Sequence, residues 1–324
     1  MERIYIIGAG VVGKATGQGF ARMGHSVTLV DVVSERVAAL RAEGLDAQIG
    51  LDLRGESEAY IFLTLPTPNA GKKYDLSAFE QGVKDVGAAL ADANAVHTVV
   101  VRSTVPPLTT ENMVKPLLEA ASGKREGVDF CLANNPEFLR AASAADDFRW
   151  PWMTVIGARN KRVQERLARL LTPFGGELRV FDNPTTTEMI KCAHNIFNAT
   201  KISYWNEMWQ VCQVLGINHD DVATTVARSA EASYNPLYGI RGGAPYGGVC
   251  LPKDTNGFLG FAAGLDMTMP LLSAVVRVNE DMADLVAKEL SDWESVKPSV
   301  PAALSVPVEE QVVENSAVHN PGTA

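Results

Sequence analysis

The sequence predicts a doubly wound α/β domain with a parallel sheet, followed by an all-α domain that begins with one long helix. Three observations predict this organisation. Short apolar segments alternate with helical segments from residue 1 to about residue 183, as in a parallel sheet that is covered by helices on both faces. The first apolar segment ends in a glycine-rich turn. From Thr187 to Leu215 no glycine or proline interrupts the chain, which predicts a helix longer than usual.

Composition limits the class of protein. A chain of 324 residues with 46% hydrophobic residues can bury a large core, and its length favours about two domains. The formal net charge of −9 argues against nucleic acid as a partner, since that surface needs clustered basic residues. Four scattered cysteines and five histidines predict neither a disulfide framework nor a metal site. The chain begins in a strand and has no apolar run of membrane-spanning length, which predicts a cytoplasmic protein without a membrane partner.

The first helical segment follows a glycine turn in the context of a Rossmann-type dinucleotide-binding domain. The turn comes directly after an apolar segment, and the next apolar segment ends in an aspartate. Such glycines bring backbone N–H groups and a helix N-terminus to a pyrophosphate. Because the aspartate can accept from both ribose hydroxyls and would repel a 2′-phosphate, NAD is favoured over NADP. The predicted cofactor-binding residues are Gly8, Gly10, Val11, Val12, Gly13, Asp31 and Arg36, with a solvated surface charge as the alternative for Arg36.

Polar residues also follow three later apolar segments. Segments 60–65 and 96–101 run into proline-rich loops that contain Thr67 and Thr104, and segment 130–134 runs into the loop 135–139. Ligands bind at the carboxyl ends of strands in such sheets, so both threonines are candidate cofactor contacts.

The long helix carries a polar face. Glu188, Lys191 and Asn195 lie three and four residues apart, so their side chains share one side of the helix. A solvated polar stripe is the alternative. Apolar residues around them, such as Phe197, instead favour a face that borders a cleft or a partner. Further helices are predicted over 220–229 and 269–290, and a flexible tail over 295–324.

The stretch 247–255 carries the strongest candidate nucleophile. Cys250 follows two glycines, which allow close backbone approach to a ligand, and precedes a lysine and an aspartate. Lys253 could favour the thiolate, the reactive form of cysteine, and Asp254 could act as a base or hold a water. The alternative is a buried structural thiol.

Together these segments resemble the UDP-glucose/GDP-mannose dehydrogenase family of nucleotide-sugar 6-dehydrogenases. The matching motifs are the glycine turn with Asp31, Ser103-Thr104-Val105-Pro106-Pro107, Asn135-Pro136-Glu137-Phe138-Leu139-Arg140, Lys191 with Asn195, and Gly247-Gly248-Val249-Cys250-Leu251-Pro252-Lys253-Asp254. The resemblance covers residues 1 to about 290. It implies oxidation of a sugar C6 alcohol, in UDP-glucose, GDP-mannose or a related nucleotide sugar, to the carboxylate with two NAD⁺.

The resemblance also implies a role for each matching residue. Cys250 traps the aldehyde as a thiohemiacetal and then carries a thioester, while Lys191 and Asn195 stabilise the oxyanions. A water held by Asp254, or Lys191 itself, takes the hydroxyl proton. Glu137 assists thioester hydrolysis, Thr104 lies near the nicotinamide, and Lys253 contacts the cofactor. The implied substrate-binding residues are Glu137, Phe138, Leu139, Arg140, Lys191, Asn195, Tyr246 and Gly247.

The chain departs from the family pattern at three places. Ala141 stands where the family usually has a second acid, four residues after Glu137, and Leu108 stands where the family commonly has a glycine. Members continue into a second α/β domain that closes over the nucleotide, and here the polar tail replaces it, so a separate chain could supply that capping domain. The predicted domains are 1–183 for NAD, 184–294 for the catalytic cysteine and a homodimer contact, and the tail 295–324. The alternatives are a truncated NAD-binding relative without activity and a β-hydroxyacid dehydrogenase.

Overall fold

The computed structural model describes residues 1–70, 73–140, 143–229, 244–247 and 250–296. These residues fall into two compact units, divided between Lys201 and Ile202, and each unit is described by itself. No helix of the described residues is long and apolar enough to cross a membrane. Most of the predicted tail, 297–324, lies outside the described residues, and its first two residues, 295 and 296, end a helix.

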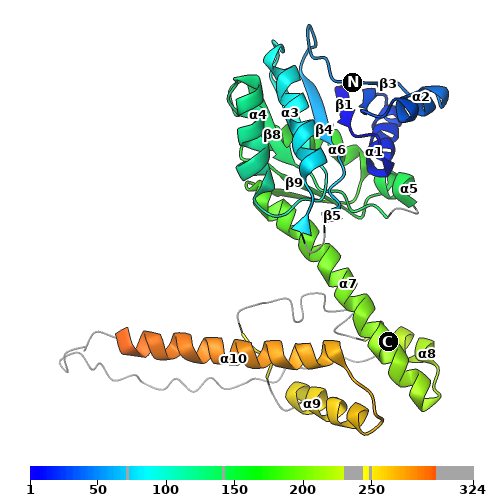
Figure 1. The fold of residues 1–324 in the computed structure, drawn as a ribbon, viewed down its shortest axis with the longest axis vertical. Helices are drawn as coiled ribbons and strands as arrows, with labels where there is room; N and C mark the ends of the chain where they lie inside the picture. The colour runs from blue at the N-terminus through cyan, green and yellow to red at the C-terminus, as the bar shows by residue number, and fades with distance from the viewer. Residues whose placement is uncertain (71–72, 141–142, 230–243, 248–249, 297–324) are drawn as a thin grey trace, which may run out of the picture. The chain divides into compact units, whose positions relative to one another are not determined.

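The first unit is built on one eight-stranded sheet (Figure 1). Its strands in chain order are β1 (Arg3–Ile7), β2 (Ser26–Val30), β3 (Ala47–Gln48), β4 (Ala59–Leu63), β7 (His97–Val101), β8 (Phe130–Asn134), β9 (Met153–Gly157) and β10 (Glu177–Phe181). A separate short hairpin pairs β5 (Asn69–Ala70) with β6 (Lys73–Tyr74). The spatial order is β10-β9-β8-β7-β4-β1-β2-β3. The strand order therefore reverses beside β1, the point at which such sheets bind ligands.

Helices cover both faces of this sheet, which confirms the predicted doubly wound fold. They are α1 (Val11–Arg22), α2 (Ser34–Ala42), α3 (Ser77–Ala91), η1 (Thr110–Val114), α4 (Lys115–Ser122), α5 (Ala144–Arg149), α6 (Lys161–Leu171) and η3 (Thr172–Phe174). Alternate residues of β1 enter different cores: Ile4 and Ile6 pack with Phe20 of α1, whereas Tyr5 and Ile7 pack with Phe79 of α3. Two apolar cores thus hold the central strands rigidly between layers.

The direction of the last two strands differs from the prediction. The strands from β3 to β8 are parallel, but β9 pairs antiparallel with β8, and β10 is parallel to β9. Only one residue pair, Asn134 with Gly157, joins β8 to β9. Because the apolar pattern of a buried strand is the same in either direction, the sequence could not distinguish the two.

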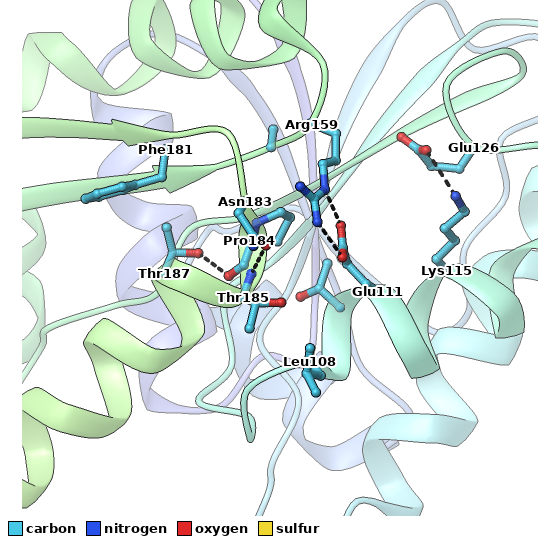
Figure 2. A network of polar contacts seen from close by, with 12 residues as sticks. Leu108, Glu111, Lys115, Glu126, Arg159, Phe181, Asn183, Pro184, Thr185 and Thr187 are labelled. Atoms are coloured by element: carbon cyan, nitrogen blue, oxygen red, sulfur yellow. Dashed lines mark hydrogen bonds and ion pairs between the residues drawn. The ribbon is translucent and has the colours of Figure 1, made fainter. Parts of the chain in front are cut away.

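The helical part begins with α7 (Pro184–Leu215), close to the predicted range, and continues with α8 (His219–Val226), α9 (Cys250–Ala263) and α10 (Pro270–Val296). Hydrogen bonds within the first turn of α7 hold its side chains in place (Figure 2), and one of these side chains also bonds to β8. The Asn183 side chain accepts from Thr185 N, and the Thr187 hydroxyl lies 2.6 Å from Asn134 Oδ1 and 2.7 Å from Pro184 O. A Cβ on Gly157 would stand 2.6 Å from the Thr187 hydroxyl, so this glycine lets α7 approach closely.

Candidate active site

The glycine turn packs tightly against the neighbouring strand end and leaves one glycine open. Gly8 has φ +93°, a conformation that disfavours any residue with a Cβ. A Cβ on Gly13 would stand 1.9 Å from Gly8 O, whereas a Cβ on Gly10 would meet nothing within 4 Å. The Thr64 hydroxyl donates to Gly8 O at 2.6 Å and holds the turn in place. Gly8 and Gly13 therefore shape the turn, and Gly10 leaves room for a ligand.

Asp31 is buried at the end of β2 and is fixed by three donors. Its Oδ2 accepts from Ala9 N and from Arg36 Nη1, both at 2.8 Å, and its Oδ1 accepts from Val33 N at 3.0 Å. Burial works to raise the pKa of the carboxyl, but these hydrogen bonds together hold it below its ordinary value. Asp31 therefore stays an acceptor over the physiological range, as a ribose-binding carboxylate must. Arg36 pairs with Asp31 instead of standing free in solvent.

Two cavities adjoin the glycine turn, each of about 380 Å³. The first extends from Gly8 and Asp31 past Arg36 to Leu51 and Leu65. The second brings together most of the predicted cofactor residues with two of the predicted catalytic ones, namely Gly8, Gly10, Val11, Val12, Arg36, Thr67, Thr104 and Glu137. An apolar pocket beside a buried carboxylate, followed by a glycine-lined pocket, fits the adenosine and pyrophosphate of a dinucleotide.

The loops after β4 and β7 are bound to each other at this site. The Thr67 hydroxyl donates to Thr104 O at 2.7 Å, and the Ser103 hydroxyl donates to Leu65 O at 2.7 Å. Both predicted threonines thus lie at the carboxyl edge of the sheet. Thr67 uses its hydroxyl to fix the backbone of Thr104.

Glu137 and Lys191 form an ion pair beside the second cavity. Lys191 Nζ lies 3.2 Å from Glu137 Oε1, and the two side chains are only 6% and 12% exposed. Lys191 Nζ also lies 5.2 Å above the ring of Phe138. Phe138 contacts Trp152 and His194 edge-on, and those two rings stack on each other. Residues 54 positions apart in the chain are therefore joined at one partly enclosed point.

The remaining predicted residues of this unit differ in their exposure and contacts. Arg140 is 79% exposed and forms a bidentate ion pair with Asp147, which raises the pKa of the guanidinium. The Leu139 backbone N–H donates to Glu137 and so fixes the loop. Asn195 lies exposed one turn after Lys191 on the same side of α7. The substrate roles predicted for these residues remain predictions.

Arg102 is a buried residue of this site that the motif analysis did not single out. It follows β7 directly, is 6% exposed, and donates to Thr16 Oγ1 at 3.1 Å and to the side chain of Asn135. Burial lowers the pKa of its guanidinium to about 10, and the charge of Glu137 opposes that shift. Arg102 thus supports the loop that carries Glu137. A charged residue directly after the apolar run Val99–Val101 was the signal available in the sequence.

In the second unit, the loop before the cysteine is bound to α10. Tyr246 N donates to Asn279 Oδ1 at 2.6 Å, and Asn279 Nδ2 donates back to Tyr246 O at 3.2 Å. The Glu207 carboxylate accepts from Leu271 N and Leu272 N and so caps the start of α10. Gly247 is exposed, with open space where a Cβ would lie.

The stretch 247–255, with the candidate nucleophile, is only partly described. Gly248 and Val249 lie outside the described residues. Cys250, Lys253 and Asp254 belong to the backbone of α9, but their side chains lie outside what the structure describes. Their predicted roles therefore remain predictions. Among the described residues, no group of three His, Cys, Asp or Glu side chains is arranged to hold a metal ion.

Comparisons with known proteins identify the family. Residues 45–175 match the NAD binding domain of the UDP-glucose/GDP-mannose dehydrogenase family, and residues 185–281 match its central domain. The UDP-glucose 6-dehydrogenase of Haloferax volcanii is 35% identical over 308 residues, which cover 87% of this chain and 71% of that protein. The chain belongs to the UDP-glucose/GDP-mannose dehydrogenase family. It is thus an oxidoreductase of an NAD-dependent family, and the predicted family and cofactor are confirmed.

Other relatives agree with this assignment. A GDP-mannose 6-dehydrogenase of Pseudomonas syringae is 33% identical over 311 residues, covering 88% of this chain and 70% of the relative. The crystal structure of a ternary complex of GDP-mannose dehydrogenase from Pseudomonas aeruginosa superposes with a TM-score of 0.81 at 30% identity. The superposition covers 88% of this chain and 71% of the Pseudomonas aeruginosa chain. Family membership sets aside the β-hydroxyacid dehydrogenase alternative.

Proposed function

We propose that this protein oxidises the C6 alcohol of a nucleotide sugar, UDP-glucose, GDP-mannose or a related one, to the carboxylate. The observation that carries the proposal is the buried Lys191–Glu137 pair at the edge of the glycine-lined cavity. It supports a reaction in which a cationic donor and a carboxylate act beside a dinucleotide. Relatives named UDP-glucose and GDP-mannose 6-dehydrogenases, each matched over about 70% of its length, support the substrate class.

The residues of the glycine turn would hold the pyrophosphate, and Asp31 would accept from the ribose hydroxyls. When bound, NAD⁺ takes up one hydride from the sugar C6 in each of two oxidation steps. The fit rests on Gly10, where a methyl group would enter open space, and on the acceptor state of the Asp31 carboxyl.

Cys250 supplies the covalent step in the proposal. The alcohol first loses a proton and a hydride to give the aldehyde. The Cys250 thiolate adds to that carbonyl carbon, and the resulting thiohemiacetal alkoxide has a C–H bond from which the second hydride leaves. The product is a thioester, whose C–S bond is broken by water to give the carboxylate and the free thiol. Two NAD⁺ are therefore consumed for each sugar.

Lys191 and Glu137 have different roles in the proposed reaction. A lysine 3.2 Å from a carboxylate is a charged donor, which suits it to stabilise the oxyanions of the thiohemiacetal and of thioester hydrolysis. Asn195, one turn later, adds a neutral donor. A water held by Asp254 then serves as the proton acceptor in the first step, and Glu137 orients the water that attacks the thioester.

The quaternary proposal is a homodimer formed through the helical part. It is supported by large apolar side chains that stand exposed along α7, among them Ile196, Phe197, Ile202 and Trp209. Large exposed apolar areas of this kind normally mark a protein contact. Light scattering on the purified chain tests it directly: a dimer mass supports the proposal, and a monomer mass at micromolar concentration contradicts it.

The function is tested by counting NADH per sugar. The purified chain is incubated with NAD⁺ and, separately, with UDP-glucose, GDP-mannose and UDP-N-acetylhexosamines, alongside Cys250→Ala and Cys250→Ser. Cys131→Ala is the matched control, because Cys131 lies in β8 and burial raises the pKa of its thiol. About two NADH per sugar, lost in both Cys250 variants and kept in the control, is the expected result. Measurable NAD⁺ binding without turnover of any sugar would instead support the inactive relative or the need for a separate capping chain.

A further inference from the structure

Glu188 lies in α7 one turn before Lys191 and has no part in the proposed chemistry. Its side chain is 1% exposed, and both carboxylate oxygens accept hydrogen bonds from the segment that follows Pro107. Leu108 N donates to Oε2 at 2.7 Å, while Thr110 N and the Thr110 hydroxyl donate to Oε1 at 2.7 and 2.6 Å. Burying a carboxylate is costly unless it is fully hydrogen-bonded, so this contact is specific.

The backbone at Leu108 needs such a partner. Leu108 has φ +76°, a left-handed conformation that is costly for a residue with a Cβ, while its side chain is half exposed and makes little packing contribution. Thr109, the next residue, is right-handed helical with φ −62°. A left-handed residue followed by a right-handed one turns successive N–H groups towards a common anion. Such strain persists only where the surroundings fix it. Here Asn112 N donates to Leu108 O at 2.8 Å within the segment, and the Glu188 carboxylate holds the segment from outside.

The same segment connects the cofactor cavity to α7. Its beginning is held by the loop after β4, since Thr104 O accepts from Thr67 and the Ser103 hydroxyl donates to Leu65 O. Its end continues into η1, where Arg159 forms a bidentate ion pair with Glu111 above Leu108 (Figure 2). Between these ends, the segment is joined to the helix that carries Lys191 by the bonds to Glu188 and by the Cys192 thiol, which donates to Val105 O at 3.5 Å.

We propose that Glu188 is a positioning residue that locks residues 104–110 against α7 and thereby fixes Thr104 relative to Lys191. The inference rests on the proposed function, in which Lys191 acts at the reacting carbon, and on the position near the nicotinamide that the family resemblance implies for Thr104. Glu188 does not touch either ligand. It acts through the backbone of Leu108 and Thr110. Its removal therefore affects turnover because the distance between Thr104 and Lys191 is no longer fixed.

The test is a double-mutant cycle between Glu188→Gln and Leu108→Gly. Glutamine keeps the shape but turns an amide N–H₂ towards a backbone N–H, so Glu188→Gln should lower kcat about tenfold or more, as expected for a misplaced reacting group. Glycine adopts the left-handed conformation without strain. In the Leu108→Gly background the same substitution should therefore cost about threefold or less in kcat, a coupling typical of groups in direct contact.

Two further variants keep the test decisive. Glu111→Gln is the matched control: it removes a carboxylate from the same helical turn, but one that pairs with the exposed Arg159, and should leave kcat within about twofold. Thr110→Val removes only the hydroxyl bond to Glu188 and serves if Glu188→Gln does not fold, with a smaller loss of kcat expected. A fall in melting temperature with unchanged kcat and no coupling to Leu108 would overturn the proposal.

NADH binding separates this inference from the proposed function. If the wild-type chain turns over no sugar, the proposed function is contradicted. The positioning role can still be tested, because Thr104 borders the cofactor cavity. Glu188→Gln should then weaken NADH binding several-fold in a fluorescence titration, and Leu108→Gly should restore part of it. NADH affinity that is equal in wild type and Glu188→Gln would, in that case, overturn the positioning role.

Discussion

Gly13 and Gly10 provide a paired test of the cofactor site, because the structure predicts opposite effects for the same substitution. At Gly13 the added methyl carbon of Gly13→Ala would stand 1.9 Å from Gly8 O and 2.7 Å from the Thr64 hydroxyl. Ordinary contact begins at 3.4 Å, so the backbone of the turn must open by about 1.5 Å in a densely packed region. We expect overpacking of this kind to cost about 2 kcal/mol of unfolding free energy, even though alanine favours helix.

The assay is thermal unfolding combined with NADH titration. A loss of about 2 kcal/mol should lower the melting temperature of a unit of this size by about 4–8 °C. Gly10→Ala is the matched control: Gly10 has φ −69°, which any residue adopts, and its methyl group would meet no atom within 4 Å. It should leave the melting temperature unchanged and weaken NADH binding about tenfold, because the methyl group enters the pyrophosphate position. Equal melting temperatures for the two variants, or undiminished NADH affinity in Gly10→Ala, would refute the reasoning.

Three further substitutions test the rest of the site. Lys191→Met should abolish most turnover while NADH still binds, and it should cost about 3 kcal/mol of stability because Glu137 is left buried without its partner. In a denaturant titration the double variant Lys191→Met/Glu137→Gln should be less destabilised than Lys191→Met. Equal losses of unfolding free energy in the two variants would argue against the ion pair. Asn279→Leu removes both hydrogen bonds to the Tyr246 backbone and should lower kcat about tenfold with NADH affinity unchanged. The control Arg277→Ala, at an exposed position of the same helix, should act like wild type. Loss of NADH affinity in Asn279→Leu would contradict the assignment of the Tyr246 loop to the substrate. Asp31→Asn tests the pH dependence of stability. The folded-state pKa of Asp31 lies below its ordinary value of 3.8, so near that pH the unfolded state binds more protons than the folded state. The stability that the carboxylate adds is therefore present above pH 3.8 and is lost as the pH falls below it. The difference in unfolding free energy between wild type and Asp31→Asn should narrow in acid denaturation below pH 3.8, and a constant difference would contradict it.

The parts of the site that could be predicted are those in which local sequence dictates position. Gly8, Gly13 and Asp31 are fixed by a strand, a turn and a strand within about thirty residues, so their spacing alone specified where they lie. Thr67 and Thr104 follow strands of one parallel sheet, which brings them to the same edge. The structure adds that one threonine binds the backbone of the other.

The rest depends on contacts between distant segments, which no local pattern encodes. The antiparallel entry of β9 depends on a single residue pair at the sheet edge. Arg102 reads as a polar strand end, yet it is buried and fixes Asn135. Arg140 belongs to a motif that implies a substrate contact, and the structure adds that its guanidinium forms an ion pair with Asp147. Each of these outcomes is decided by which side chain lies opposite in space.

The departure at Leu108 illustrates how sequence and structure complement each other. The sequence marked Leu108 as unusual because a glycine commonly stands there, and the structure gives the physical reason: the position has φ +76°. A leucine is tolerated because Glu188, 80 residues later, binds its N–H. Since Glu188 and Lys191 lie on one side of α7, the helix that presents the charged donor also holds the loop beside the cofactor cavity. In the proposed mechanism the same few turns of α7 supply a charged donor and align it. Substitutions at Leu108 and Glu188 should therefore couple in turnover, while those at the neighbouring Glu111–Arg159 pair should not.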